Sequence, residues 1–148
     1  RFKCDWSSDV CSSDLQLVGY PIVRLREGVG VVDYVRALET AVIALLTGYG
    51  LECGRVEGRT GVWLPASGDR PERKICAIGV RVAKRTTMHG FALNVLSSAE
   101  RFSNIIACGI TDAGVTSIVE ELGGSWTVKG VADDLRAPLL RALAPILD

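Results

Sequence analysis

Two long apolar segments separated by only three residues constrain the fold of this chain more than any other feature. Residues 74–83 (KICAIGVRVA) alternate in part between apolar and polar side chains, and residues 87–96 (TMHGFALNVL) are apolar around a single glycine. Segments of this length and composition are typical of central strands. Residues 84–86 leave room for little more than a turn, so the pattern predicts a hairpin within a sheet.

The segments around this hairpin predict shorter strands and amphipathic helices. A helix is predicted from Asp33, a candidate N-cap, to about Thr47, because apolar residues recur there at three- and four-residue steps. The remaining predicted elements are strands at 17–25, 55–57 and 60–64 and helices at 100–106, 116–122 and 128–147. Pro21 favours an edge strand or a bulge, and Pro138 is expected to end or kink the last helix. This order predicts an α+β domain with a mixed or antiparallel sheet and flanking helices.

Charge and hydropathy exclude several classes of protein. The 148 residues carry 17 Lys+Arg and 17 Asp+Glu, and this balance argues against a nucleic-acid-binding or membrane-surface protein. No apolar run reaches the ~18 residues of a membrane span. The hydrophobic fraction of 48% is normal for a globular domain. We therefore expect one globular domain with neither nucleic acid nor membrane as a partner.

The first fifteen residues (RFKCDWSSDVCSSDL) differ from the rest of the chain. They follow neither helical nor strand periodicity and lack the apolar core of a secretory signal. A tandem SSD also occurs in low-complexity linkers. Residues 4–15, however, resemble the translation of a common sequencing adapter. We therefore expect residues 1–15 to be non-native and residues 16–148 to be a truncated catalytic domain.

Few residues beyond position 15 suggest chemistry. The single histidine, His89, has no GxSxG motif to work with, and the chain contains neither a P-loop nor a GxGxxG motif. The acidic pairs Glu120–Glu121 and Asp133–Asp134 are expected on solvated helix surfaces. The three cysteines after residue 15 form no CxxC motif or Cys/His cluster, which argues against a disulfide framework and a metal site. Their pattern favours a reducing compartment, and hence the cytoplasm.

Cys108 and Lys74 remain as candidates. Cys108 lies among polar and chain-breaking residues in IIACGITD, whereas Cys53 and Cys76 follow a helix end and lie within an apolar strand. A cysteine is most often a small buried hydrophobe, and a lysine at a strand end most often faces solvent. A cysteine nucleophile nevertheless needs a cationic or basic neighbour, which lysine supplies. Sequence spacing leaves open whether Lys74 and Cys108 meet.

Six segments together resemble the lipoyl(octanoyl) transferase family. They are QLVGYPIV (16–23), YVRALE (34–39), GRTGVW (58–63), KICAIGVRV (74–82), TMHGFALNV (87–95) and ACGI followed by VTS (107–117). The segments come in the family's order and span about two-thirds of the chain. KIxAIG alone is also similar to the biotin and lipoate ligases. The resemblance implies a biotin/lipoyl protein ligase-like fold that lacks its N-terminal part.

The resemblance also implies site residues, position by position. Cys108 matches the family's acyl-accepting cysteine, and Lys74 matches its partner lysine. Two further segments match the lining of the acyl site: Ala77, Ile78 and Gly79 in the first, and Gly90, Phe91 and Ala92 in the second. His89 is expected to support the strand or the pocket wall. Lys74 would lower the pKa of the Cys108 thiol or take its proton. The backbone N–H groups of residues 78–79 are candidates to bind the oxyanion that forms when the thiolate attacks a thioester carbonyl.

The activity implied is the first step of lipoate biosynthesis. An octanoyl group passes from octanoyl-acyl carrier protein through a Cys108 thioester to a lysine of a lipoyl domain. The acceptors implied are the lipoyl domains of 2-oxoacid dehydrogenase complexes and the glycine cleavage H protein. The resemblance further implies a monomer that needs no cofactor or metal, because a thioester is already activated.

The chain departs from the family at two places. Ala107 stands where the family has proline before the cysteine, and the family's RGG and HGPG segments do not precede Gln16. Two alternatives stay open. The missing segments allow a truncated, non-catalytic fragment, and the shared fold allows an ATP-dependent lipoate or biotin ligase.

Overall fold

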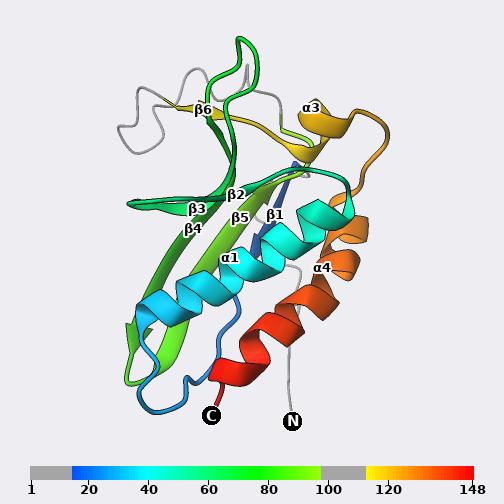
Figure 1. Cartoon of the computed structure of the whole chain (residues 1–148). Helices are drawn as coiled ribbons and strands as arrows, with labels where there is room; N and C mark the ends of the chain where they lie inside the picture. Colours follow the sequence, from blue (N-terminus) through cyan, green and yellow to red (C-terminus); the bar gives the residue numbers. More distant parts are fainter. Residues whose placement is uncertain (1–14, 98–112) are drawn as a thin grey trace.

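The computed structural model describes residues 15–97 and 113–148 as a sheet with helices packed on one face (Figure 1). The strands are β1 (Gln16–Gly19), β2 (Gly54–Val56), β3 (Arg59–Leu64), β4 (Arg73–Ala83), β5 (Thr86–Asn94) and β6 (Gly114–Val115). The helices are α1 (Val31–Gly48), α3 (Ile118–Leu122), α4 (Val128–Leu143) and the 3₁₀ helix η2 (Ala144–Ile146). The sheet order is β1-β5-β4-β3-β2, with β6 beside β4. Only β6 pairs in parallel among these strands, so the predicted α+β class with a mixed sheet is confirmed.

The predicted hairpin is the centre of the sheet. Strands β4 and β5 pair without interruption from Cys76↔Leu93 to Ala83↔Thr86. Lys84 and Arg85 form the turn, and both have positive φ angles, of 50° and 64°. Two consecutive left-handed residues are the conformation of a two-residue turn whose twist matches that of the strands.

Helix α1 begins before the predicted N-cap. Gly30 is the N-cap, and Asp33 lies in the first turn, where its carboxylate accepts a hydrogen bond of 2.8 Å from the Gly30 N–H. Asp33 therefore caps the helix from inside and not from the position before it. The predicted apolar face is buried at Leu38, Val42 and Leu46.

The predicted strand at 17–25 is much shorter in the structure. It ends at Gly19, and beyond Pro21 the chain makes only isolated bridges, such as Arg24↔Thr86. Pro21 has no N–H to donate to a ladder, and its carbonyl accepts hydrogen bonds from Tyr34 Oη (2.7 Å) and Thr87 Oγ1 (2.8 Å). The expectation of an edge strand is confirmed, because β1 pairs with β5 at the end of the sheet.

The C-terminal helices also differ in detail from the prediction. Pro138 lies inside α4 without ending it, and the α-helix runs on to Leu143 before the 3₁₀ turn. Helix α3 starts at Ile118 with Ser117 as its N-cap and stops at Gly123, whose φ is 64°. The helix predicted at 100–106 lies outside the described residues.

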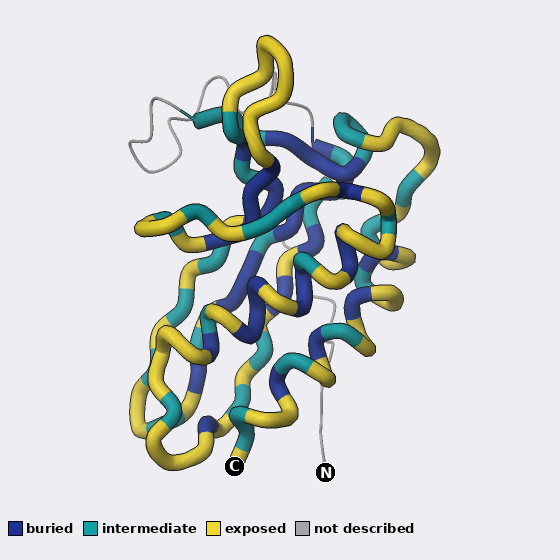
Figure 2. The backbone as a smooth tube through the Cα atoms, in the orientation of Figure 1, coloured by how far each residue is buried: buried dark blue, intermediate teal, exposed yellow. Residues whose placement is uncertain are grey.

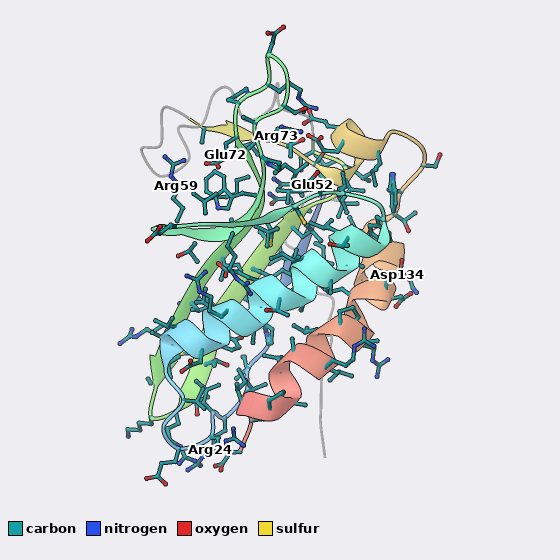
Figure 3. All side chains as sticks on the ribbon, in the orientation of Figure 1. Arg24, Glu52, Arg59, Glu72, Arg73 and Asp134 are labelled. Carbon is teal, nitrogen blue, oxygen red and sulfur yellow. The ribbon has the colours of Figure 1, made fainter. Side chains whose placement is uncertain are left out.

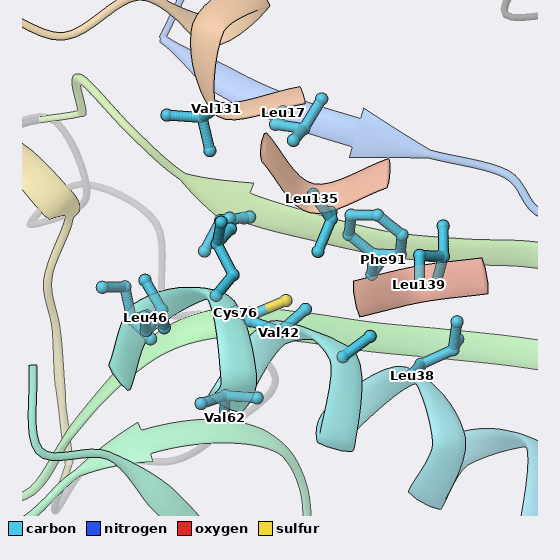
Figure 4. Packing of buried hydrophobic residues seen from close by; sticks show 14 of the residues in the cluster. Leu17, Leu38, Val42, Leu46, Val62, Cys76, Phe91, Val131, Leu135 and Leu139 are labelled. Atoms are coloured by element: carbon cyan, nitrogen blue, oxygen red, sulfur yellow. The ribbon is translucent and has the colours of Figure 1, made fainter. Parts of the chain in front are cut away.

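One apolar core fills the space between the sheet and helices α1 and α4. Figure 2 shows the buried residues of α1 on the side that faces the sheet. In Figure 4, side chains from α1, α4 and the sheet meet: Leu38, Val42, Leu46, Leu135, Leu139, Leu17, Val62, Cys76 and Phe91. Their burial removes apolar surface from water, which holds both helices on this face.

Candidate active site

A β-bulge decides where Lys74 points. In the ladder between β3 and β4, Val62 pairs with Cys76 and the next residue, Trp63, pairs with Lys74, so Ile75 is an extra residue in β4. Successive residues of a strand face opposite sides, and a one-residue bulge reverses that alternation. Lys74 therefore shares the face of Trp63, away from the helix-side core that holds Val62 and Cys76. Without the bulge, Lys74 would point into that core.

The side chain of Lys74 runs across a glycine to an indole ring. Its Nζ lies 4.6 Å from the centroid of the Trp63 ring, and its Cδ lies 3.7 Å from the point where a Cβ on Gly61 would stand. Gly61 has φ +118°, and a Cβ there would collide with the carbonyl oxygen of Cys76. Glycine is therefore required beneath the lysine. Lys74 is half-buried, unlike the usual lysine at a strand end, which faces solvent.

The chain segment that follows Cys108 is attached beside Lys74. Residues 98–112, which contain Cys108, lie outside the described residues, but β6 begins at Gly114 and pairs in parallel with Arg73 and Lys74. The N–H of Thr116 donates to the Lys74 carbonyl at 3.0 Å. The Asn94 amide at the end of β5 donates to the Thr116 carbonyl at 2.9 Å. The described residues on both sides of the Cys108 segment thus meet at the Lys74 end of the sheet.

The two predicted lining segments lie directly opposite each other in the hairpin. Their cross-strand pairs are Ala77↔Ala92, Ile78↔Phe91 and Gly79↔Gly90. Ala77 and Gly79 share the face of Lys74, whereas Ile78 and Phe91 turn to the helix side. Phe91 is a core residue, only 3% exposed, with its ring over Gly19. The predicted lining set therefore divides between the lysine face and the core.

Gly90 and His89 mark an unusual stretch of backbone. A Cβ on Gly90 would collide with the carbonyl oxygen of Gly19 in β1, so a side chain does not fit there. His89 is exposed and has φ 62°, in the left-handed region. His89 is therefore part of strand β5, but its exposed side chain does not form a buried pocket wall.

A groove of about 550 Å³ lies where α1 approaches the hairpin. Its lining includes the predicted residues Ile78 and Gly79 of β4, together with Val32 and Val35 of α1 and Thr60 of β3. The pairing of β3 with β4 ends at Cys76, so the edge of β4 beyond that residue borders the groove. The groove runs from α1 to the free edge of β4, and Lys74 is not among its lining residues.

Glu39 of α1 is a buried charge that the sequence analysis did not single out. It is fully buried, and its carboxylate accepts hydrogen bonds from Arg36 (2.7 Å), Arg55 (2.8 Å) and the Gly61 N–H (3.1 Å). Three donors compensate for the loss of hydration. The contact with Gly61 ties α1 to the strand position beneath Lys74. Glu39 belongs to the YVRALE segment, which was the only signal for it.

The expectation that Glu121 lies on a solvated surface is wrong. Its carboxylate forms an ion pair with Arg73, its side chain is only 7% exposed, and Thr116 Oγ1 donates to it at 2.6 Å. The hydrogen bonds from Arg73 lower the pKa of Glu121 to about 2, assisted by Thr116 and by the charges of Arg73 and Arg70. Figure 3 shows Arg73 and Glu72 near β6, and Arg73 directly precedes Lys74 in the chain. The other acidic pair, Asp133 and Asp134, is exposed as expected. Lys129 donates a hydrogen bond to Asp133, and Tyr49 Oη donates one to Asp134.

Both described cysteines are structural. Cys76 is completely buried, and burial raises the pKa of its thiol far above the ordinary range. Cys53 is half-buried, and burial raises its pKa to about 11. Both are free thiols and stay protonated at neutral pH, as expected for core cysteines.

Among residues 15–97 and 113–148, no group of three or more His, Cys, Asp or Glu side chains gathers in a geometry that could hold a metal ion. Within the same residues, no helix has the length and apolar character needed to cross a membrane.

The sequence has clear relatives among curated proteins. An octanoyltransferase of Mycobacterium sp. (strain KMS) is 59% identical over 128 residues, which cover 86% of this chain and 54% of the relative. An octanoyltransferase of Cutibacterium acnes is 64% identical over 107 residues, which cover 72% of this chain and 39% of the relative. The chain thus spans about half the length of the curated relatives that it matches.

Solved structures share the fold. The apo biotin protein ligase of Aquifex aeolicus matches with a TM-score of 0.57 at 17% identity, over 77% of this chain and 46% of that chain. A bipartite lipoate protein ligase of Thermoplasma acidophilum matches with a TM-score of 0.54 at 20% identity, over 82% of this chain and 48% of that chain. These likenesses confirm the biotin/lipoyl ligase-like fold. The family model of the lipoyl protein ligase A/B catalytic domain matches residues 10–139, and the chain belongs to this family.

Proposed function

We propose that this chain carries the catalytic part of an octanoyltransferase. It acts in the cytoplasm as a monomer, takes octanoyl groups from octanoyl-acyl carrier protein, and delivers them to lysines of lipoyl domains in 2-oxoacid dehydrogenase complexes and the glycine cleavage H protein. The proposed catalytic pair is Cys108 and Lys74. The proposed domain extends over residues 16–148, and residues 1–15 are proposed to be foreign to it.

The observation that carries the proposal is the attachment of β6 beside Lys74. Cys108 precedes Gly114 by six residues. Chain connectivity therefore keeps the cysteine within about 20 Å of β6, even for a fully extended segment. The identity of 59–64% to named octanoyltransferases supports the same reaction.

The chemistry proposed is acyl transfer in two steps. The Cys108 thiolate attacks the thioester carbonyl, the bond to the carrier's sulfur breaks, and the carrier leaves as a thiol after protonation. The acceptor lysine then attacks octanoyl-Cys108, an amide forms, and the Cys108 thiol is regenerated. As an ammonium, Lys74 is proposed to favour the Cys108 thiolate and then to give its proton to the departing carrier thiolate. As a neutral amine it then accepts the proton of the incoming lysine and returns a proton to Cys108. The small residues Ala77, Gly79 and Ala92 are proposed to leave space for the acyl group, with Ile78 and Phe91 supporting that surface from behind. Gly90 is proposed to contribute by letting β5 approach β1 closely beside them.

The first test is to trap the acyl-enzyme. The protein, produced from its complete reading frame, is mixed with octanoyl-acyl carrier protein and analysed by mass spectrometry without ATP. We expect a mass gain of one octanoyl group, located on Cys108 by peptide mapping. Cys108→Ala should abolish the adduct, and Cys53→Ala is the matched control because Cys53 is also a free thiol outside the core strand. An adduct that persists in Cys108→Ala would refute the assignment.

The same assay separates the proposal from its alternatives. A ligase of this fold would need ATP and would exchange labelled pyrophosphate, whereas the proposed transferase would do neither. A fragment without activity would unfold without a cooperative transition and form no adduct. Lys74→Ala should slow acylation more at neutral pH than above pH ~8.5, where a free cysteine ionises by itself. Resequencing the source DNA ahead of Gln16 tests the proposed domain start.

A further inference from the structure

Trp63 is the aromatic partner of the Lys74 side chain. The two residues are direct cross-strand neighbours of β3 and β4, and Nζ lies 4.6 Å from the ring centroid. A cation over an indole face within about 6 Å is attracted by the ring quadrupole, and tryptophan gives the strongest such attraction. Arg59 also approaches this ring, with Cζ at 5.5 Å, and forms an ion pair with Glu72. The lysine is thus the nearer of two cations.

Packing on the helix-side core does not explain this tryptophan. Trp63 is 2% exposed, yet it does not belong to the core cluster formed by the sheet, α1 and α4. Its buried Nε1 has no hydrogen-bond partner among the residues that the structure describes. An indole face also attracts a cation more strongly than a phenyl face does.

The backbone around Trp63 is arranged so that the lysine reaches the ring. The bulge at Ile75 sets Lys74 on the tryptophan face, and Gly61 leaves the lysine stem a path across β3. Glu39 holds the Gly61 N–H from the helix side. The bulge and the glycine therefore both favour the contact between Nζ and the indole, and Glu39 holds that glycine in place.

We propose that Trp63 is a positioning residue, whose ring holds the Lys74 ammonium over β3 and so fixes it on the face shared with Ala77 and Gly79. The consequence for catalysis rests on the proposed function, whereas the contact between Lys74 Nζ and the Trp63 ring does not. A flexible lysine chain loses rotamer freedom when it is held in one place, and the ring offsets that cost before substrate arrives.

The contact is tested by NMR without any turnover. The lysines of the chain are Lys3, Lys74, Lys84 and Lys129, so ¹³Cε labelling gives few signals, and Lys74→Arg assigns the relevant one. We expect its ε-methylene resonance to be shifted upfield by the ring current. Trp63→Leu should remove the shift, and Trp63→Phe should keep part of it. A Lys74 signal that is the same in all three proteins would overturn the proposal.

Activity supplies the second measurement. Trp63→Leu should lower kcat for octanoylation of Cys108 about two- to five-fold, the range that a cation–π contact of ~0.5–1 kcal/mol supports, with KM for the carrier unchanged. Trp63→Phe should recover most of the rate. An unchanged kcat in Trp63→Leu, or a loss that appears only in KM, would contradict the positioning role.

The control keeps folding defects apart from positioning defects. Trp126→Leu makes the same substitution at a ring that packs at a tilt against Tyr49 with centroids 4.8 Å apart, and it should change neither the Lys74 signal nor kcat. If Trp63→Leu does not fold, Trp63→Phe alone still decides, because a phenyl ring must shift Lys74 by a different amount from an indole. If the wild-type protein shows the ring-current shift but transfers no octanoyl group, the contact between Lys74 and Trp63 is supported and the proposed function is refuted.

Discussion

Arg73 and Glu121 form a two-bond ion pair that joins the start of β4 to α3. Arg73 Nε lies 2.6 Å from Glu121 Oε1, and Nη2 lies 2.9 Å from Oε2. Arg73 also donates to the Pro65 carbonyl at 2.9 Å. Because Arg73 directly precedes Lys74, this pair anchors both α3 and β6 against the strand end that carries the proposed catalytic lysine.

Removal of one partner of this pair should destabilise the fold strongly. Glu121→Ala leaves the guanidinium of Arg73 buried without its counter-charge, and we expect a loss of about 3–5 kcal/mol in the free energy of unfolding. Urea titration measures the loss. The double variant Arg73→Met with Glu121→Leu should recover most of it, since neither charge is then left unpaired. A single variant with wild-type stability would show that the pair is not buried in solution.

The same carboxylate should make stability depend on pH at the acid end. The pKa of Glu121 in the folded protein is about 2, below the ordinary value of 4.5. A depressed folded-state pKa contributes stability above the unfolded pKa, and that contribution disappears as the pH falls from about 4.5 to 2. We expect urea midpoints to drop across this window. In Glu121→Gln the drop should be smaller, and an equally steep profile would assign the effect to other groups.

Gly61 should tolerate no side chain. Gly61→Ala places a methyl group against the Cys76 carbonyl at a residue with φ +118°. We expect a loss of about 1–3 kcal/mol in unfolding free energy and a displaced Lys74 signal in the NMR measurement. Gly54→Ala is the matched control, because a Cβ there meets nothing within 4 Å. Equal stability of the two variants would be incompatible with the close approach of β3 to β4.

Glu39 should protect the Gly61 amide. Glu39→Ala removes the acceptor of that N–H, and we expect faster hydrogen exchange at Gly61 together with a loss of about 3 kcal/mol in stability. Glu39→Gln keeps an acceptor oxygen and should retain part of the protection. Exchange followed by NMR at single-residue resolution checks both variants. Unchanged exchange at Gly61 in Glu39→Ala would mean that the 3.1 Å contact does not persist in solution.

Local patterns determined most of the elements. The β4–β5 hairpin and the apolar face of α1 follow from periodicity within short windows, because alternation and three- to four-residue spacing are properties of a few consecutive residues. The resemblance to the transferase family pointed to Lys74 and to the two lining segments, and these segments do lie opposite each other. The strand predicted at 17–25 was too long because Pro21 uses its carbonyl for tertiary contacts with Tyr34 and Thr87.

Tertiary structure decided how the candidate site is arranged. No local signal shows that Ile75 bulges out of the ladder, since this depends on which residue of β3 each residue of β4 meets. The burial of Glu121 likewise depends on Arg73, which is 48 residues away in the chain. By itself, the sequence determined which residues are present at the site and which local elements carry them. The faces on which they lie were decided by pairing between distant segments, because a register shift of one residue moves a side chain from the core to the opposite surface.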